Sequence, residues 1–182
     1  MTSIYTKKGD DGDTGLLGEG RFSKASLRID VLGNLDEASA ALAVARSAID
    51  DTKINLVLSR IQKDLYNMMA EVGATPENAH TFRRIDKACV DWLEQQIEQN
   101  LEITGAPTEF IIPGEVSSSA YLSLARTIVR RAERRLVELH TREPFENPHL
   151  ITYINRLSSL CFSLELLENH RKGVSTRAIK DL

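Results

Sequence analysis

The sequence predicts an all-α protein: a bundle of five helices preceded by a glycine-rich N-terminal segment. Apolar residues recur at helical spacing over five long stretches, and the connections between these stretches are short. By contrast, the first two dozen residues carry half of the ten glycines of the chain and cannot form a stable helix. Long helices with short connections pack most simply as an antiparallel bundle. The expected helices span residues 26–49, 53–72, 85–99, 116–140 and 148–170.

A chain of 182 residues, 42% of them hydrophobic, is the right size for one compact domain with a substantial core. We therefore expect residues 1–182 to form a single domain, with the N-terminal segment at 1–25 and the helical bundle at 26–172. The formal net charge of −3 argues against nucleic acid as a partner, because domains that bind nucleic acid are usually basic.

The sequence also predicts a cytoplasmic protein that does not enter a membrane. No apolar run is long enough to cross a bilayer, and the N-terminus lacks the hydrophobic segment of a signal peptide. Cys89 and Cys161 lie far apart, each in an apolar helical context, as reduced core cysteines would. A transition-metal site built by the protein is not expected, because no ligand spacing relates His80, His140, His149 and His170.

The fourth expected helix carries an arginine ladder, which we define as Arg126, Arg130 and Arg134 on successive turns, with Glu133 on the same side as Arg126. Like charges four residues apart repel each other, so such a ladder is favourable mainly when a polyanion lies across it. The alternative is a solvent-exposed face whose positive charge is partly neutralised by Glu133 and Glu138. The adjoining apolar arc is expected to be buried and comprises Leu122, Ala125, Val129, Ala132 and Leu136.

The glycine-rich start offers a second site for a polyanion. Backbone amides freed by glycines, flanked by Lys7 and Lys8, can cradle phosphate groups. The segment is neither a Walker A loop nor a dinucleotide-binding fingerprint, and its aspartates lack the EF-hand spacing. A flexible terminus without a ligand is the alternative.

The last expected helix has two faces. Its core stripe comprises Leu150, Tyr153, Leu157, Leu160, Cys161 and Leu164. Nearly opposite, Asn155, Ser159, Phe162 and Leu166 recur at helical spacing. An apolar face away from the core needs a cover, and a neighbouring subunit and a flat ligand are the two candidates. Alternatively, Phe162 closes an irregular core.

In combination, these features resemble the cob(I)alamin adenosyltransferases of the propanediol-utilisation type, also called corrinoid adenosyltransferases. The resemblance covers nearly the whole chain in four ordered blocks. These are Tyr5 to Gly12 with Thr14 and Lys24; Gly33-Asn34-Leu35-Asp36-Glu37; Phe110 to Gly114 followed by Ala125-Arg126-Thr127 and Arg130 to Arg134; and Asn155-Arg156-Leu157-Ser158 with Phe162. It implies a ferritin-like, cobalamin adenosyltransferase-like bundle.

The resemblance implies a homotrimer with active sites between subunits, which hold ATP, Mg²⁺ and cobalamin. It places Asp36 against Arg126 as an ion pair between subunits, and Phe110, Phe162 and Ser159 on the corrinoid side. A reductase and an adenosylcobalamin-dependent enzyme are the implied further partners. The residues implied in ATP binding are Thr6, Lys7, Lys8, Gly9, Thr14, Gly15, Lys24, Arg130, Arg131, Glu133, Arg134 and Asn155.

The implied reaction is transfer of the 5′-deoxyadenosyl group from ATP to Co(I), with Asp36, Arg126, Phe110 and Arg130 in the catalytic centre. Glu133 is expected to orient an arginine, or alternatively to help bind Mg²⁺. Phe110 is expected either to shape the corrinoid site or to fill the core. Members usually have a second glycine, a histidine and an aspartate where this chain has Glu115, Ser123 and Ser159. Ser123 and Ser159 motivate one alternative, a carrier of corrinoid or nucleotide that does not catalyse. A helical scaffold whose arginines contact another protein or RNA is the third hypothesis, and the acidic net charge weighs against it.

Overall fold

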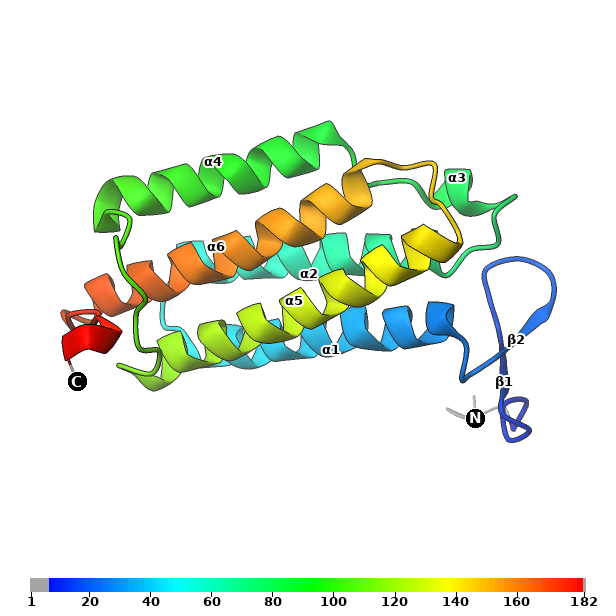
Figure 1. Ribbon diagram of the computed structural model, residues 1–182, viewed down its shortest axis with the longest axis horizontal. Coiled ribbons are helices and arrows are strands. Elements are labelled where there is room, and N and C mark those ends of the chain that lie inside the picture. The colour runs from blue at the N-terminus through cyan, green and yellow to red at the C-terminus, as the bar shows by residue number, and fades with distance from the viewer. Residues whose placement is uncertain (1–6, 182) are drawn as a thin grey trace.

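The computed structural model describes residues 7–181 of the chain, and its body consists of long helices that run along one another (Figure 1). Helix α5 packs against α1 and α6, while α4 covers α6 and α2 covers α1. A short helix, α3, lies between α2 and α4, and a 3₁₀ turn, η1, ends the described chain. The elements are α1 Leu27–Ala48, α2 Thr52–Val72, α3 Ala79–Phe82, α4 Lys87–Thr104, α5 Ser117–Arg142, α6 His149–Arg171 and η1 Ile179–Asp181.

Each of the five expected helices has a counterpart in the structure, and the largest difference at any end is five residues, at the end of α4. Two of the starts have a clear local cause. The carboxylate of Asp51 accepts a hydrogen bond from the Ile54 amide at 2.8 Å, and that of Asp86 accepts one from Cys89 at 3.0 Å. Such N-caps satisfy amides that have no partner inside the helix.

The core lies where the periodicity of the sequence places it. The apolar arc of α5 is fully buried, and every residue of the α6 core stripe has at most 2% of its surface exposed. Cys161 is buried within this stripe, and both cysteines are free thiols. Burial raises the pKa of the Cys161 thiol to about 12, so this thiol stays protonated and inert.

The glycine-rich N-terminal segment contains a small sheet that the all-α prediction did not include. Strands β1 (Asp13–Gly15) and β2 (Arg21–Ser23) form an antiparallel hairpin in which Thr14 pairs with Phe22. Strands of three residues are too short to show an alternating pattern in the sequence. The hairpin connection is anchored to the end of α2, because the Leu17 amide donates to the Gly73 carbonyl at 2.8 Å.

A second tertiary contact lies at the other end of the bundle, where the C-terminal segment pairs with the connection between α4 and α5 (Figure 1). The Ile112 amide donates to the Arg177 carbonyl at 2.9 Å, and the Ile179 amide donates to the Phe110 carbonyl at 2.8 Å. This pairing fixes the backbone from Phe110 to Ile112. Within the described residues, no helix is both long enough and apolar enough to span a membrane.

Candidate functional site

A cavity of about 530 Å³ lies between the connection of α4 to α5 and the facing sides of α5 and α6. It brings together five residues that the sequence analysis singled out: Phe110, Arg126, Arg130, Ser159 and Phe162. The remaining lining residues are Pro107, Thr108, Glu109, Ile111, Pro113, Ser123, Ser158 and Glu165.

The aromatic side of the cavity settles one alternative. Phe110 is 86% exposed, so the expectation that it fills the core is wrong. Phe162 is half-buried on α6, and Ser159 next to it is exposed. An exposed phenylalanine on a backbone held by two hydrogen bonds is a surface suited to a flat apolar ligand.

The floor of the cavity carries two buried polar atoms without partners. The Nε atom of Arg126 donates no hydrogen bond within the described residues, and the Oε1 atom of Glu165 accepts none. Burial raises the pKa of Glu165, although the Ser123 hydroxyl and the positive charge of Arg126 act in the opposite direction. The sequence analysis missed Glu165. Its signal was a carboxylate one turn after Cys161, on the core side of the last helix.

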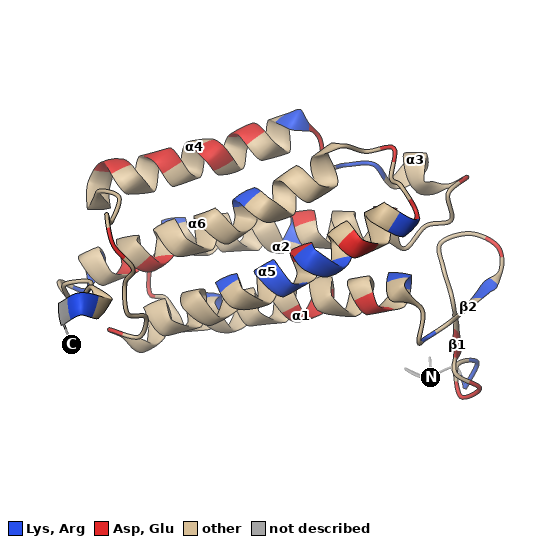
Figure 2. Cartoon of the chain, in the orientation of Figure 1, with Lys and Arg blue, Asp and Glu red and all other residues tan. Residues whose placement is uncertain are grey.

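The members of the arginine ladder differ in their surroundings. Arg126 is half-buried at the cavity floor, whereas Arg130 is exposed at the cavity wall. Arg134 is also exposed but does not line the cavity, and its Nη1 atom donates to the carbonyl of Arg130 at 3.1 Å. Figure 2 shows basic bands recurring along α5, whereas α4 is banded with acidic residues. The positive charge is therefore local, as a site for one polyanion requires.

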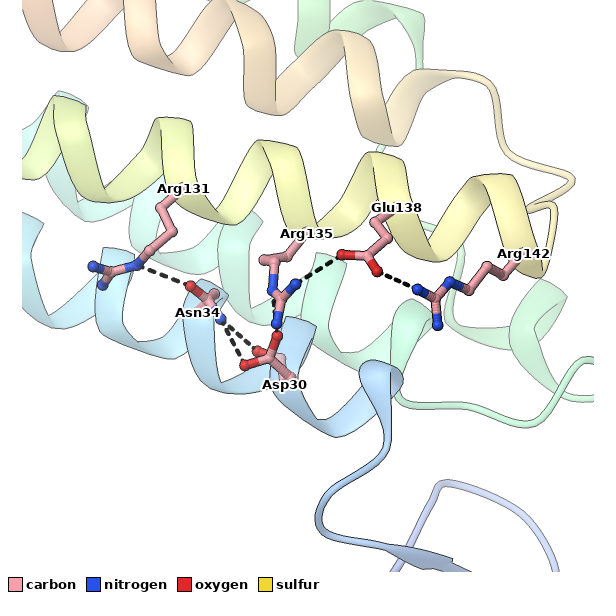
Figure 3. Close-up of polar contacts among 6 residues, drawn as sticks. All are labelled: Asp30, Asn34, Arg131, Arg135, Glu138 and Arg142. Carbon is pink, nitrogen blue, oxygen red and sulfur yellow. Dashed lines mark hydrogen bonds and ion pairs between the residues drawn. The ribbon is translucent and has the colours of Figure 1, made fainter.

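The neighbouring arginines reach across to α1 (Figure 3). The Arg131 Nε atom donates to Asn34 at 3.0 Å, and the same guanidinium forms an ion pair with Glu37. Arg135 forms an ion pair with Asp30 at 2.6 Å. Thus Asn34 and Glu37, from the second block of the resemblance, hold Arg131 in place. A phosphate group at Arg131 would compete with these contacts.

Glu133 has a different partner from the expected one. Its carboxylate accepts a hydrogen bond from the Asn155 side chain at 2.7 Å, and it forms no ion pair with an arginine of the described chain. The side-chain Oδ1 atom of Asn155 in turn accepts a hydrogen bond from Arg156 at 2.8 Å. Glu133 therefore orients Asn155, which is itself one of the expected nucleotide-binding residues.

The N-terminal segment is a folded loop in the described residues. Lys24 closes it, because its Nζ atom donates to the Gly9 carbonyl at 2.6 Å and its amide donates to Gly12 at 2.8 Å. Arg21, which the sequence analysis missed, donates to the Lys8 carbonyl and forms an ion pair with Asp11 at 3.0 Å. Of the expected ATP-binding residues, Lys7, Lys8, Gly9, Thr14, Gly15 and Lys24 lie in this loop and its hairpin, and Thr6 lies outside the described residues.

One chain does not bring the N-terminal hairpin and the cavity of Phe110 together, because no hairpin residue lines that cavity. The hairpin lies at the end of the bundle where α1 begins and α5 ends, whereas the connection that carries Phe110 lies at the opposite end (Figure 1). Asp36 is exposed on α1 and lines a separate groove of about 580 Å³ together with Gly15 and Tyr66. Within the described chain, Asp36 makes no ion pair with Arg126.

Comparisons with known proteins agree with this architecture. A sequence model of a family described as cobalamin adenosyltransferase matches residues 4–168. A corrinoid adenosyltransferase of Citrobacter freundii is 34% identical over 169 residues, which cover 92% of this chain and 96% of that protein. A corrinoid adenosyltransferase of Mycobacterium tuberculosis is 39% identical over 176 residues, which cover 93% and 90%.

A solved structure of a similar protein has the same fold. A point variant of a PduO-type ATP:corrinoid adenosyltransferase from Lactobacillus reuteri, complexed with cobalamin and ATP, superimposes with a TM-score of 0.90 at 29% identity. That match covers 98% of this chain and 97% of the other. Because the family match spans most of the chain, and relatives above 30% identity cover nearly all of it, the chain belongs to the cobalamin adenosyltransferase family.

Proposed function

We propose that this protein is an ATP:corrinoid adenosyltransferase. It transfers the 5′-deoxyadenosyl group of ATP to the reduced cobalt of cobalamin and releases triphosphate. The observation that carries the proposal is the cavity in which the rings of Phe110 and Phe162 and the guanidiniums of Arg126 and Arg130 meet. Aromatic rings suit the flat corrin, and the Arg130 guanidinium suits phosphate groups, whereas Arg126 is expected to pair with Asp36 of a neighbouring chain. The similar Lactobacillus reuteri enzyme was solved with both ligands.

The chemistry requires little covalent work from the protein. The electron pair of Co(I) attacks the 5′ carbon of ATP, a cobalt–carbon bond forms, and the bond from that carbon to the triphosphate oxygen breaks. The electron pair of the broken bond leaves with triphosphate, so no general base is needed. The protein instead stabilises the charge of the leaving group, through Lys24, the loop amides, Arg130 and Arg134. Loss of one such contact is expected to cost about 2–4 kcal/mol of transition-state stabilisation.

A complete site is expected only between subunits, in a homotrimer. The hairpin end of one chain would meet the α5 and α6 face of its neighbour, with Asp36 of the first chain against Arg126 of the second. Two observations support this arrangement. No residue of the N-terminal hairpin lines the cavity of its own chain, and Arg126 has a buried nitrogen without an acceptor in the described chain. Head-to-tail contacts of this kind close into rings.

Mg²⁺ is expected to arrive with the nucleotide. Between residues 7 and 181, no three or more His, Cys, Asp or Glu side chains group together as a metal site would require. This fits an ion held mainly by phosphate oxygens with one or two carboxylates. Glu133 is the candidate, because Asn155 occupies its Oε1 atom and leaves Oε2 available.

The remaining partners follow from the reaction. Co(I) must be supplied by a reductase, and adenosylcobalamin must be passed to an enzyme that depends on it. A cytoplasmic location is part of the proposal, supported by the two free cysteines.

The test is anaerobic. The protein is mixed with chemically reduced cobalamin, Mg²⁺ and ATP, and the expected result is a light-sensitive alkylcobalt spectrum with one triphosphate per adenosylcobalamin. Arg130→Ala should lose most of this activity while its thermal unfolding stays close to that of the wild type. Absence of both products with the wild type would contradict the proposal.

A carrier without turnover is the second candidate, favoured by Ser123 and Ser159, the two departures that line the cavity. Corrinoid binding without triphosphate release would support it. A scaffold would show neither binding nor an ATP-dependent shift in Tm.

A further inference from the structure

Glu165 has an unusual position for a carboxylate. It lies on α6 among core residues with only 1% of its surface exposed, and it borders the cavity of Phe110 and Phe162. Its Oε1 atom accepts no hydrogen bond within the described residues. The Ser123 hydroxyl donates a hydrogen bond to this carboxylate, so only one of its two buried oxygens lacks a donor.

Arg126 is the group that could complete this partnership. Its Nε atom is buried and lacks an acceptor within the described residues, and it borders the same cavity. The positive charge of Arg126 also acts to lower the pKa of Glu165. One donor and one acceptor are thus left open at the same cavity, and a change of side-chain rotamer that joined them would satisfy both.

Ser123 is the partner that the Glu165 carboxylate already has at this cavity. Ser123 lies one turn before Arg126 on α5, is buried, and offers only a small hydroxyl group. The resembling family usually has a histidine near this position and an aspartate at the position of Ser159. In this chain both are serines, and the carboxylate at the cavity comes from Glu165 instead.

We propose that Glu165 is a positioning residue for Arg126. It accepts a hydrogen bond from the Arg126 Nε atom and holds the guanidinium at the cavity floor, with the terminal nitrogens directed toward Asp36 of a second copy. The contact itself stands on the geometry of one chain, whereas its effect on corrinoid use rests on the proposed function.

A double-mutant cycle read in Tm tests the contact without any activity. In the wild-type background, Glu165→Gln should lower Tm, because a charge-assisted hydrogen bond is lost. In the Arg126→Met background the same change should raise Tm, because it removes a buried charge that has no partner. The two effects should differ by at least about 2 °C. Equal effects in both backgrounds would overturn the proposal.

Steady-state kinetics test the positioning role. Glu165→Gln should raise KM for reduced cobalamin about tenfold and leave ATP binding, measured without corrinoid, within about twofold of the wild type. Glu168→Gln is the matched control. Glu168 is equally buried on the same helix and accepts a hydrogen bond from Ser118 at 2.7 Å, but it does not line the cavity. Its variant should lower Tm and leave KM for cobalamin unchanged.

An equal rise of KM in both variants would mean that α6 has loosened generally, and it would overturn the positioning role. If the wild type forms no adenosylcobalamin, the proposed function fails, and the cycle in Tm still decides whether Glu165 contacts Arg126.

Discussion

Phe110 combines an exposed ring with an anchored backbone. The ring is 86% exposed, and the carbonyl of the same residue accepts a hydrogen bond from Ile179. Little apolar area is buried by this side chain, so it contributes little to the free energy of unfolding. A ligand that covers the ring would bury this apolar area, and the burial would stabilise the complex.

We therefore expect Phe110→Ala to change the free energy of unfolding by no more than about 0.5 kcal/mol. Adenosylcobalamin formation should fall at least about tenfold, because the corrinoid loses its apolar contact. Chemical denaturation and the anaerobic assay measure the two effects. Leu56→Ala removes another exposed apolar side chain, outside the cavity, and should change neither quantity. A parallel loss of stability and activity in Phe110→Ala would contradict the prediction.

Glu71 is a second buried carboxylate, remote from the cavity. It accepts a hydrogen bond from Asn147 at 3.0 Å and pairs with Arg83 at 3.4 Å, yet burial outweighs both and raises its pKa above the ordinary value of 4.5. The folded protein therefore binds this proton more tightly than the unfolded chain does. The resulting stabilisation is present below the ordinary pKa and is lost as pH rises through the raised pKa of the folded state.

Glu71→Gln should consequently gain stability relative to the wild type between about pH 4 and about pH 8, because the variant side chain stays neutral. Urea titrations at the two pH values measure the difference in the free energy of unfolding. Glu98→Gln, at an exposed site on α4, should show no such trend. A difference for Glu71→Gln that does not change with pH would mean that Glu71 has an unperturbed pKa.

At the scale of elements, the N-terminal hairpin is placed by a short contact with the end of α2. Leu17 exchanges backbone hydrogen bonds with Gly73 and Thr75, and Gly18 packs against the Thr75 side chain. Gly18 has a φ of +152°, and a Cβ atom there would lie 2.6 Å from Thr75. Only glycine fits this position without a shift.

Gly18→Ala should therefore move the hairpin away from α2 and weaken ATP binding about tenfold, while Tm changes by less than about 2 °C. Isothermal titration and thermal unfolding measure the two quantities. Glu19→Ala, at the next and exposed position, serves as the control and should bind ATP normally. Unchanged ATP affinity in Gly18→Ala would show that the placement of the hairpin does not matter for the nucleotide.

The C-terminal segment holds the connection that carries Phe110 through backbone hydrogen bonds, as the end of α2 holds the hairpin. Ile179→Pro removes the amide that donates to the Phe110 carbonyl, a contact worth about 0.5–1.5 kcal/mol. We expect faster proteolysis between residues 107 and 113 and a lower turnover, with little change in Tm. Lys180→Ala removes only an exposed ion pair with Glu109 and should leave both rates unchanged. Equal proteolysis of Ile179→Pro and the wild type would contradict the anchoring role.

At the scale of the whole molecule, the main feature is the distance between the two halves of the proposed site. The loop closed by Lys24 lies at one end of the bundle, and the connection between α4 and α5, which borders the cavity, lies at the other (Figure 1). No residue of that loop lines the cavity of its own chain. A second copy is the simplest source of the missing half.

Mixing two inactive variants tests this arrangement. Lys24→Ala and Arg130→Ala should each be nearly inactive alone, because each lacks one half of the site. When the two are unfolded and refolded together, about a quarter of the wild-type rate should return, because one neighbour in each productive pair supplies each intact half. The separately refolded variants, mixed afterwards, are the control. No recovery after co-refolding would place the whole site within one chain.

Periodicity alone located the long helices, since burial of one face imposes the same spacing wherever a helix packs. The buried stripes of α5 and α6 were predicted residue by residue for this reason. The hairpin could not be predicted, because three-residue strands are held by pairing and by Leu17 rather than by their own composition. The site was predicted in part: Phe110, Arg126, Arg130 and Phe162 share a cavity, but Glu165 was overlooked within a core stripe.

The sequence by itself determined the helices, the core and the chemical character of the site, because these follow from the spacing and type of side chains along the chain. Only the tertiary structure decided which arginines remain available. Arg131 is held by Asn34 and Glu37, whereas Arg126 has a buried nitrogen with no acceptor in the described chain. Contacts between helices far apart in the sequence determine which charges are neutralised. The spacing of residues along one helix cannot predict these contacts.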